Sequence, residues 1–213
     1  MRWLRRQKTK RRLAIAMQIV LIGMFLVGIV HRNVSVIVNS AIGVMVSFLP
    51  AILQRDYGLP MNPGLTLWIT AAVFFHALGT VAVPGSGVSF YQSFWWWDHL
   101  THALSASVVA AVGYTTVRAI DLHTEQLSFP PKFMVVFTVL FVVAFGVLWE
   151  ILEFLLGIIT PLYIGGSILT QYGLTDTMMD LIFDAVGGLI VGLWGSASLS
   201  GLTDALVDKL ERQ

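Results

Sequence analysis

The 213-residue sequence contains no cysteine. Disulfides, iron–sulfur clusters and thiolate metal sites are therefore excluded, and any bound metal would be held by histidine, carboxylate or backbone oxygen. Charged residues make up only 12% of the chain, about half the share that is usual in soluble domains. Hydrophobic residues make up 56%, and the mean hydropathy is +0.79. This composition predicts an integral membrane protein.

Apolar runs of membrane-spanning length recur along the chain. A hydrocarbon core of ~30 Å is crossed by about 20 helical residues. The first run is followed by HRNVS, which lacks an A-x-A-like cleavage site, so we expect this run to be retained as a span. The sequence predicts an all-α, polytopic membrane helical bundle of about six transmembrane helices, at residues 13–30, 34–53, 65–83, 98–120, 133–159 and 176–199.

Lysine and arginine are distributed unevenly around these spans. Of the 13 basic residues, seven precede residue 13 and five more fall on the same side of the membrane, whereas only Arg32 falls on the other. By the positive-inside rule both termini are cytoplasmic, in the inner or plasma membrane. We expect a basic cytoplasmic segment at 1–12 that contacts anionic membrane lipids rather than nucleic acid, a six-helix transmembrane domain at 13–201, and a short cytoplasmic tail at 202–213.

The outer half of the predicted bundle lacks basic residues that could pair with its acids. Six carboxylates fall at this depth, and Arg32 is the only nearby Lys or Arg. An ionised carboxylate near the membrane centre costs ~2.5–3.5 kcal/mol on insertion scales. Protonation, a water-filled cavity or a bound cation would each remove this cost. Histidines beside the acids favour a cation.

These acids and histidines recur at intervals of three and four residues, which places them on common helix faces. Helices that each present such groups form carboxylate metal sites inside bundles. Imidazole combined with carboxylate favours a divalent metal such as Zn²⁺, Mn²⁺ or Fe²⁺ over Ca²⁺. We predict metal ligands at Asp98, His99, His102, Glu153 and Asp180, catalytic carboxylates at Glu150 and Asp184, and further site residues at His76 and Asp176.

Simpler roles remain open for several of these residues. Asp98 and Asp176 fit N-cap positions, His76 fits a core histidine bonded to a carbonyl, and His99 fits a side chain reaching for the interface. The acids well inside their spans fit such roles less well. The aromatic cluster in SFYQSFWWW is typical of a belt at headgroup level, with a substrate platform as the alternative.

The second half of the chain resembles the YjdF-like family of small inner-membrane proteins, which has no established activity. The resemblance rests on Trp97, Asp98 and His102, on Glu150 and Glu153, and on TQYGLTDTMMD with Thr170, Gln171, Asp176 and Asp180. It covers about residues 93–188. Gly173 and Leu174 stand where that family has an acidic residue. The resemblance implies a shared polar site without naming its chemistry.

Three functions fit these patterns. The first is a membrane-embedded, metal-dependent hydrolase or lipid-modifying enzyme with a lipid-like or isoprenoid substrate. The second is a cation- or proton-coupled transporter or channel, which is less favoured because the acids are confined to the outer half and paired broken helices are lacking. The third is a non-catalytic membrane sensor or assembly protein.

Overall fold

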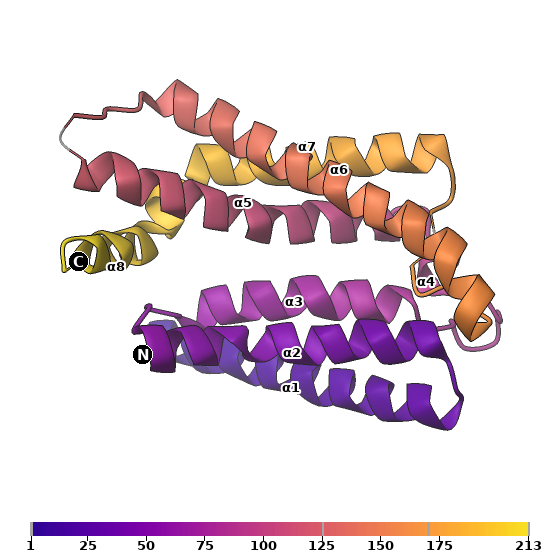
Figure 1. Ribbon diagram of the computed structural model, residues 1–213. Helices are drawn as coiled ribbons and strands as arrows, with labels where there is room; N and C mark the ends of the chain where they lie inside the picture. Colours follow the sequence, from indigo (N-terminus) through magenta and orange to yellow (C-terminus); the bar gives the residue numbers. More distant parts are fainter. Residues whose placement is uncertain (1, 125, 170, 213) are drawn as a thin grey trace.

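The computed structural model describes residues 2–124, 126–169 and 171–212. These residues form helices and a single isolated β-bridge between Ala82 and Ser89, so the prediction of an all-α protein is confirmed (Figure 1). The helices are α1 (Arg2–Val30), α2 (Val34–Tyr57), α3 (Pro63–Gly79), α4 (Phe90–Ser93), α5 (Trp97–His123), α6 (Pro131–Ile164), α7 (Leu174–Ser198) and α8 (Ser200–Leu210).

Five of these helices, α1, α2, α5, α6 and α7, are long and apolar enough to cross a membrane. The third expected span corresponds to α3, an apolar helix of 17 residues, which is ~25 Å long at 1.5 Å per residue. A polytopic helical membrane bundle is thereby confirmed. Both termini lie at the same end of the bundle (Figure 1); the side of the membrane that they face stays a prediction.

Local sequence explains where the helices begin and end. Asn33 Oδ1 accepts the Val36 N–H at 3.1 Å at the start of α2, and Asn62 caps α3 in the same way. Pro63 follows as the first residue of α3, where its missing N–H costs nothing. Gly58 ends α2 in the left-handed conformation, with φ 62°, which glycine adopts without strain.

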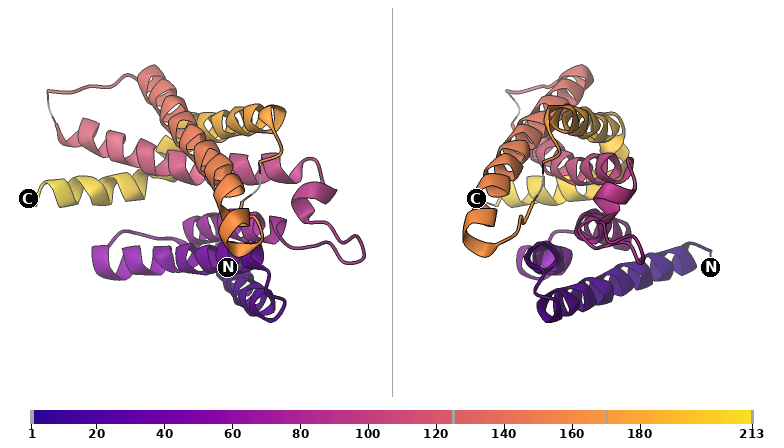
Figure 2. Two further views of the ribbon diagram at one scale, coloured as in Figure 1. Left: turned by 45° about the vertical axis from the view of Figure 1, so that its right-hand side comes forward. Right: turned by 90° about the vertical axis from the view of Figure 1, so that its right-hand side faces the viewer.

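The helices form two layers. The N-terminal layer consists of α1, α2 and α3, and the C-terminal layer of α5, α6 and α7 with α8 folded back on α5 (Figures 1 and 2). The layers meet where α3 packs against α5. We call the end of the bundle with α4 and the α6–α7 connection the site end, and the end with both termini the terminal end.

Glycine permits the closest approach within the C-terminal layer. A Cβ on Gly187 of α7 would overlap the carbonyl oxygen of Ala103 on α5. The missing side chain therefore lets the two backbones touch, as small residues do in membrane helix pairs. An apolar core that includes Leu65, Ala110 and Val191 lies beside this contact, toward the terminal end.

Candidate metal site

Three side chains at the site end form a compact group that we call the ligand group: Asp98, His102 and Asp180. Each offers one ligand atom, and these atoms all lie within 4.8 Å of one another. His102 Nε2 is 3.6 Å from Asp98 Oδ1 and 3.9 Å from Asp180 Oδ1. Ligands 2.0–2.2 Å from one ion are separated by at most about 4.4 Å. The spacing around His102 therefore fits a shared metal.

The helices bring this group together for simple reasons. Asp98 and His102 are four residues apart on α5, so their side chains lie along one face. Asp180 comes from the first turns of α7, which the Gly187 contact holds against α5. Neither α5 nor α7 has a side-chain N-cap bond, since their N-caps are Trp96 and Gly173. The N-cap interpretation of Asp98 and Asp176 is therefore wrong.

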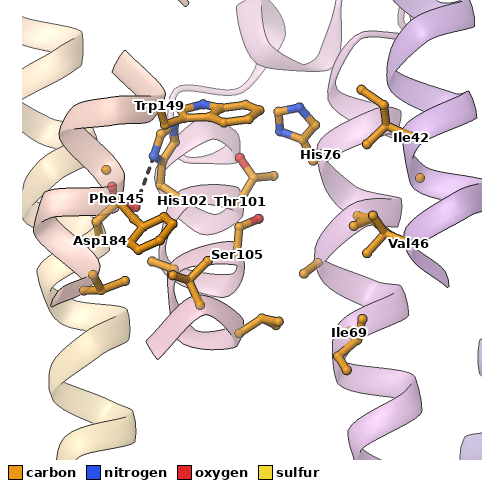
Figure 3. Close-up of a pocket in the computed structure, with 18 of the residues that line it drawn as sticks. Ile42, Val46, Ile69, His76, Thr101, His102, Ser105, Phe145, Trp149 and Asp184 are labelled. Atoms are coloured by element: carbon orange, nitrogen blue, oxygen red, sulfur yellow. Dashed lines mark hydrogen bonds and ion pairs between the residues drawn. The ribbon is translucent and has the colours of Figure 1, made fainter. Parts of the chain in front are cut away.

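Asp184 interacts with the other nitrogen of the His102 ring. Its Oδ1 lies 3.2 Å from His102 Nδ1, the interaction drawn as a dashed line in Figure 3. In the tautomer that carries its proton on Nδ1, His102 donates to Asp184, and Nε2 offers its lone pair to the ligand group. Asp184 fits against α6 because Gly146 has no side chain there; a Cβ at that position would overlap Asp184 Oδ2.

Two buried carboxylates have no hydrogen-bond partner among the described residues. Asp180 is 1% exposed and Glu150 is 5% exposed, and all four of their carboxylate oxygens lack a partner. Buried polar atoms are almost always hydrogen-bonded, and an unpaired buried charge is costly. Within the described chain, Lys and Arg form ion pairs only with Asp56 and Asp121. Basic residues therefore do not neutralise these acids.

The other predicted site residues of α5, α6 and α7 make different contacts. His99 Nδ1 is 3.7 Å from Asp180 Oδ1, and its ring stacks on Phe183 with centroids 4.6 Å apart. Glu153 is buried, and its Oε1 accepts the Trp149 Nε1–H at 3.1 Å. Asp176 is different, because its Oδ2 accepts the Tyr172 N–H at 2.9 Å and ties down the α6–α7 connection.

His76 lies apart from the ligand group, in a chain of side-chain hydrogen bonds. Asn39 Nδ2 donates to the Ile168 carbonyl at 3.0 Å, which leaves Asn39 Oδ1 to accept from His76 Nε2 at 3.1 Å. His76 Nδ1 then accepts the Tyr91 O–H at 2.9 Å. Burial raises the pKa of Tyr91 well above its ordinary value, so the phenol keeps its proton.

These hydrogen bonds agree with the interpretation of His76 as a core histidine, although the His76 ring is bonded to side chains rather than to a carbonyl. Sequence reasoning missed Asn39 and Tyr91. Asn39 could have been found as an amide inside an apolar run, since such groups need partners within a membrane. Tyr91 gave no such signal among its aromatic neighbours.

A cavity of about 400 Å³ adjoins the ligand group between the two layers. His102, Asp184 and His76 line its polar end, and aliphatic and aromatic side chains line most of the remainder (Figure 3). Sequence reasoning also missed Trp149, whose ring lies edge-on to His76 and lines the same cavity. The site therefore combines a group of metal-ligand type with an apolar chamber.

The comparisons with known proteins cover part or most of the chain. It is 31% identical over 140 residues to a protein of Thermotoga maritima described as an uncharacterized protein, and the match spans 66% of each chain, just under two thirds. No solved structure matches. Of the residues on which the YjdF-like resemblance rests, Thr170 lies outside the described residues. The family described as "Predicted membrane protein (DUF2238)" matches residues 13–201. The chain belongs to this family of membrane proteins.

Proposed function

We propose that this protein is a membrane-embedded, metal-dependent hydrolase or lipid-modifying enzyme whose metal is held by the ligand group. The observation that carries the proposal is the pair of buried, unpartnered carboxylates, Asp180 and Glu150, beside an oriented imidazole. Ionisable groups inside a membrane are expensive and mark functional sites. A divalent cation would neutralise these acids where lysine and arginine do not.

The donor set favours Zn²⁺, Mn²⁺ or Fe²⁺. One imidazole with two carboxylates from Asp98 and Asp180 is a mixed nitrogen and oxygen set, which Ca²⁺ does not prefer. His99, whose Nδ1 is 3.7 Å from Asp180 Oδ1, is a further candidate ligand, and we keep the buried Glu153 as another. When bound, such a metal supplies an activated water molecule at neutral pH.

The remaining carboxylates have distinct roles in this proposal. Glu150 lies outside the ligand group, and both of its oxygens lack a hydrogen-bond partner among the described residues, so it would serve as the general base toward water activated by the metal. Asp184 acts through His102 by fixing its tautomer and orientation. We therefore propose Asp184 as a positioning residue, although the sequence predicted a catalytic one.

The surroundings favour a lipid-like or isoprenoid substrate. The cavity beside His102 is mostly apolar, and an aromatic cluster that includes Trp96 and Trp97 lies at the site end. The resemblance to the YjdF-like family also extends over the ligand group. We propose an inner or plasma membrane location, with the site end facing outward and both termini in the cytoplasm.

The test begins with metal analysis of protein purified in detergent without chelator. We expect near-stoichiometric metal in the wild type and in Glu150→Gln, and strongly reduced metal in Asp180→Asn. The metal-loaded wild type is then incubated with a native lipid extract, and products are followed by mass spectrometry. Product formation that is lost in Glu150→Gln despite retained metal is the expected result.

Three results would contradict the proposal. Wild-type protein that stays metal-free after incubation with Zn²⁺, Mn²⁺ or Fe²⁺ would show that the ligand group does not bind these metals. Ion flux in liposomes that collapses in Asp184→Asn, with no lipid product from the wild type, would instead establish a cation or proton transporter. A protein that binds metal but shows neither lipid product nor flux would favour a sensor or assembly role.

A further inference from the structure

The cavity between the layers is an elongated chamber with one polar end. On α3 its lining runs from Ile69 to His76, and on α6 from Val142 to Trp149. Seven residues of helix correspond to ~10 Å along the axis. Figure 3 shows His76, Trp149 and His102 at one end and Ile69 at the other. The chamber therefore extends from the ligand group toward the terminal end.

The mouth of this chamber is apolar and lies at mid-helix. Ile42 of α2 and Phe145 of α6 both line the chamber, yet they are 47% and 48% exposed. Within the described chain, α2 and α6 are not among the closely packed helix pairs, whereas α3 and α5 are. Both residues lie far from the ends of their helices. An opening at this depth faces hydrocarbon rather than water.

The size of the chamber limits its occupant. Ligand pockets usually measure roughly 300–1,000 Å³, so a volume of about 400 Å³ lies near the lower limit. This volume admits one hydrocarbon chain and excludes a complete two-chain lipid. Beyond the polar end the lining is aliphatic and aromatic except for Ser105, so it offers few hydrogen-bond partners to a polar occupant. Burial of an apolar chain is favourable at roughly 25 cal/mol per Å².

We infer that the chamber holds one hydrocarbon chain of a membrane lipid, which enters sideways between Ile42 and Phe145. The polar end of that lipid then lies beside His102 and Asp184, and the chain extends toward Val46 and Ile69. The fate of the bound lipid rests on the proposed function, whereas the binding of the chain does not. Val46 and Ile69 set the longest chain that fits.

The test uses the full chain in liposomes that contain phosphatidylethanolamine with a diazirine at the end of one acyl chain. After irradiation, labelled residues are located by mass spectrometry. We expect enriched labelling at Val46 and Ile69. Val46→Phe fills the chamber and should lower labelling at Ile69 about tenfold or more. The matched control Ile19→Phe, on an exposed position of α1, should leave chamber labelling unchanged.

Metal analysis of the same samples separates the two proposals. Val46→Phe should keep the wild-type metal content, because Val46 lies away from the ligand group. Ile69→Phe, which fills the chamber from α3, provides a second test if Val46→Phe does not fold. Labelling spread evenly over lipid-facing residues, or unchanged in both variants, would overturn the inference. Chamber labelling in a protein that binds no metal would overturn the proposed function alone.

A competition experiment identifies the source of the chain. Excess unlabelled phosphatidylethanolamine and excess polyprenyl phosphate are added separately before irradiation. Stronger competition by the first identifies an acyl chain, and by the second an isoprenoid chain; both agree with a hydrocarbon occupant. Unchanged chamber labelling with either competitor would show that the diazirine probe does not bind a specific chamber.

Discussion

Buried aspartates at the two ends of α5 differ in their ion pairs and hydrogen bonds. At the terminal end, the Asp121 side chain is 6% exposed, and it pairs with Arg118 and accepts the Phe129 N–H at 2.7 Å. At the site end, the acids gathered against α5 have no lysine or arginine, and both oxygens of Asp180 lack a hydrogen-bond partner among the described residues. Similar burial therefore comes with complete pairing at one end and incomplete pairing at the other.

This difference distinguishes a structural acid from an acid that is available to a ligand. The Asp121 carboxylate is satisfied by the protein alone, and it fixes the turn between α5 and α6. The Asp180 carboxylate is costly unless a cation or proton joins it. The comparison therefore gives a practical criterion for polar groups in membrane bundles: partners, rather than burial, indicate which acids have a function beyond folding.

Exchanging each carboxylate for an amide should give the largest difference between the two ends of α5. Since outer partners of metal ligands already contribute 10–100-fold to affinity, Asp180→Asn should weaken metal binding about 100-fold or more. Asp121→Asn should leave metal affinity unchanged, and it should lower the free energy of unfolding by about 1–2 kcal/mol through loss of its charged partners. Competition with a colorimetric chelator and thermal unfolding in detergent measure the two effects.

The metal-free proteins provide the control for this exchange. Without metal, Asp180→Asn should be at least as stable as the wild type, because the substitution removes an uncompensated buried charge. A marked loss of stability in metal-free Asp180→Asn, equal to that of Asp121→Asn, would show that both aspartates are structural.

Removing the carboxylate that orients the ligand should have a smaller effect. Asp184→Asn keeps the size of the side chain but weakens its hold on His102 Nδ1, so metal affinity should fall roughly 10–100-fold. The matched variant Asp176→Asn changes an acid that is bonded to the Tyr172 N–H instead, and its metal affinity should stay at the wild-type value. Equal losses in both variants would point to a general effect of negative charge.

Close packing of α5 and α7 can be tested with paired glycine substitutions. Gly187→Ala would force its Cβ into the Ala103 carbonyl, and overpacking of this kind costs about 1–3 kcal/mol. Gly23→Ala in α1 meets nothing within 4 Å, so it should be neutral or stabilising by up to about 1 kcal/mol. Thermal unfolding ranks the variants, and the reverse order would contradict the packing described for this layer.

The smallest effect is expected from the hydrogen-bond chain around His76. Tyr91→Phe keeps the ring but removes the hydroxyl that donates to His76 Nδ1, which should cost about 1 kcal/mol of unfolding free energy. Metal affinity should not change, because His76 is outside the ligand group. A weakened metal affinity in Tyr91→Phe would show that the hydrogen bonds around His76 and the ligand group act together.

Sequence reasoning predicted the features that depend on local pattern. Apolar runs gave the helices, and the four-residue spacing of Asp98 and His102 placed both side chains on one face of α5. The shared depth of these residues and Asp180 followed from the order of the spans. These predictions succeeded because helical periodicity and membrane thickness act within each segment.

Features that depend on packing between segments could not be predicted. The pairing of Asp184 with His102 Nδ1 requires a side-chain gap at Gly146, and the bonds of His76 require Tyr91 to fold back from another element. The third expected span also ended at Gly79 rather than at residue 83, since Ala82 pairs with Ser89 in a turn. Each of these contacts joins residues whose mutual position no local pattern specifies.

X-ray absorption spectroscopy of the metal-loaded protein tests the central claim most directly, because it reports the atoms bound to the metal. We predict at least one imidazole nitrogen together with carboxylate oxygens at about 2.0–2.2 Å, and loss of the imidazole signal in His102→Ala. A spectrum of oxygen ligands alone, unchanged by His102→Ala, would show that the metal binds elsewhere and would contradict the account.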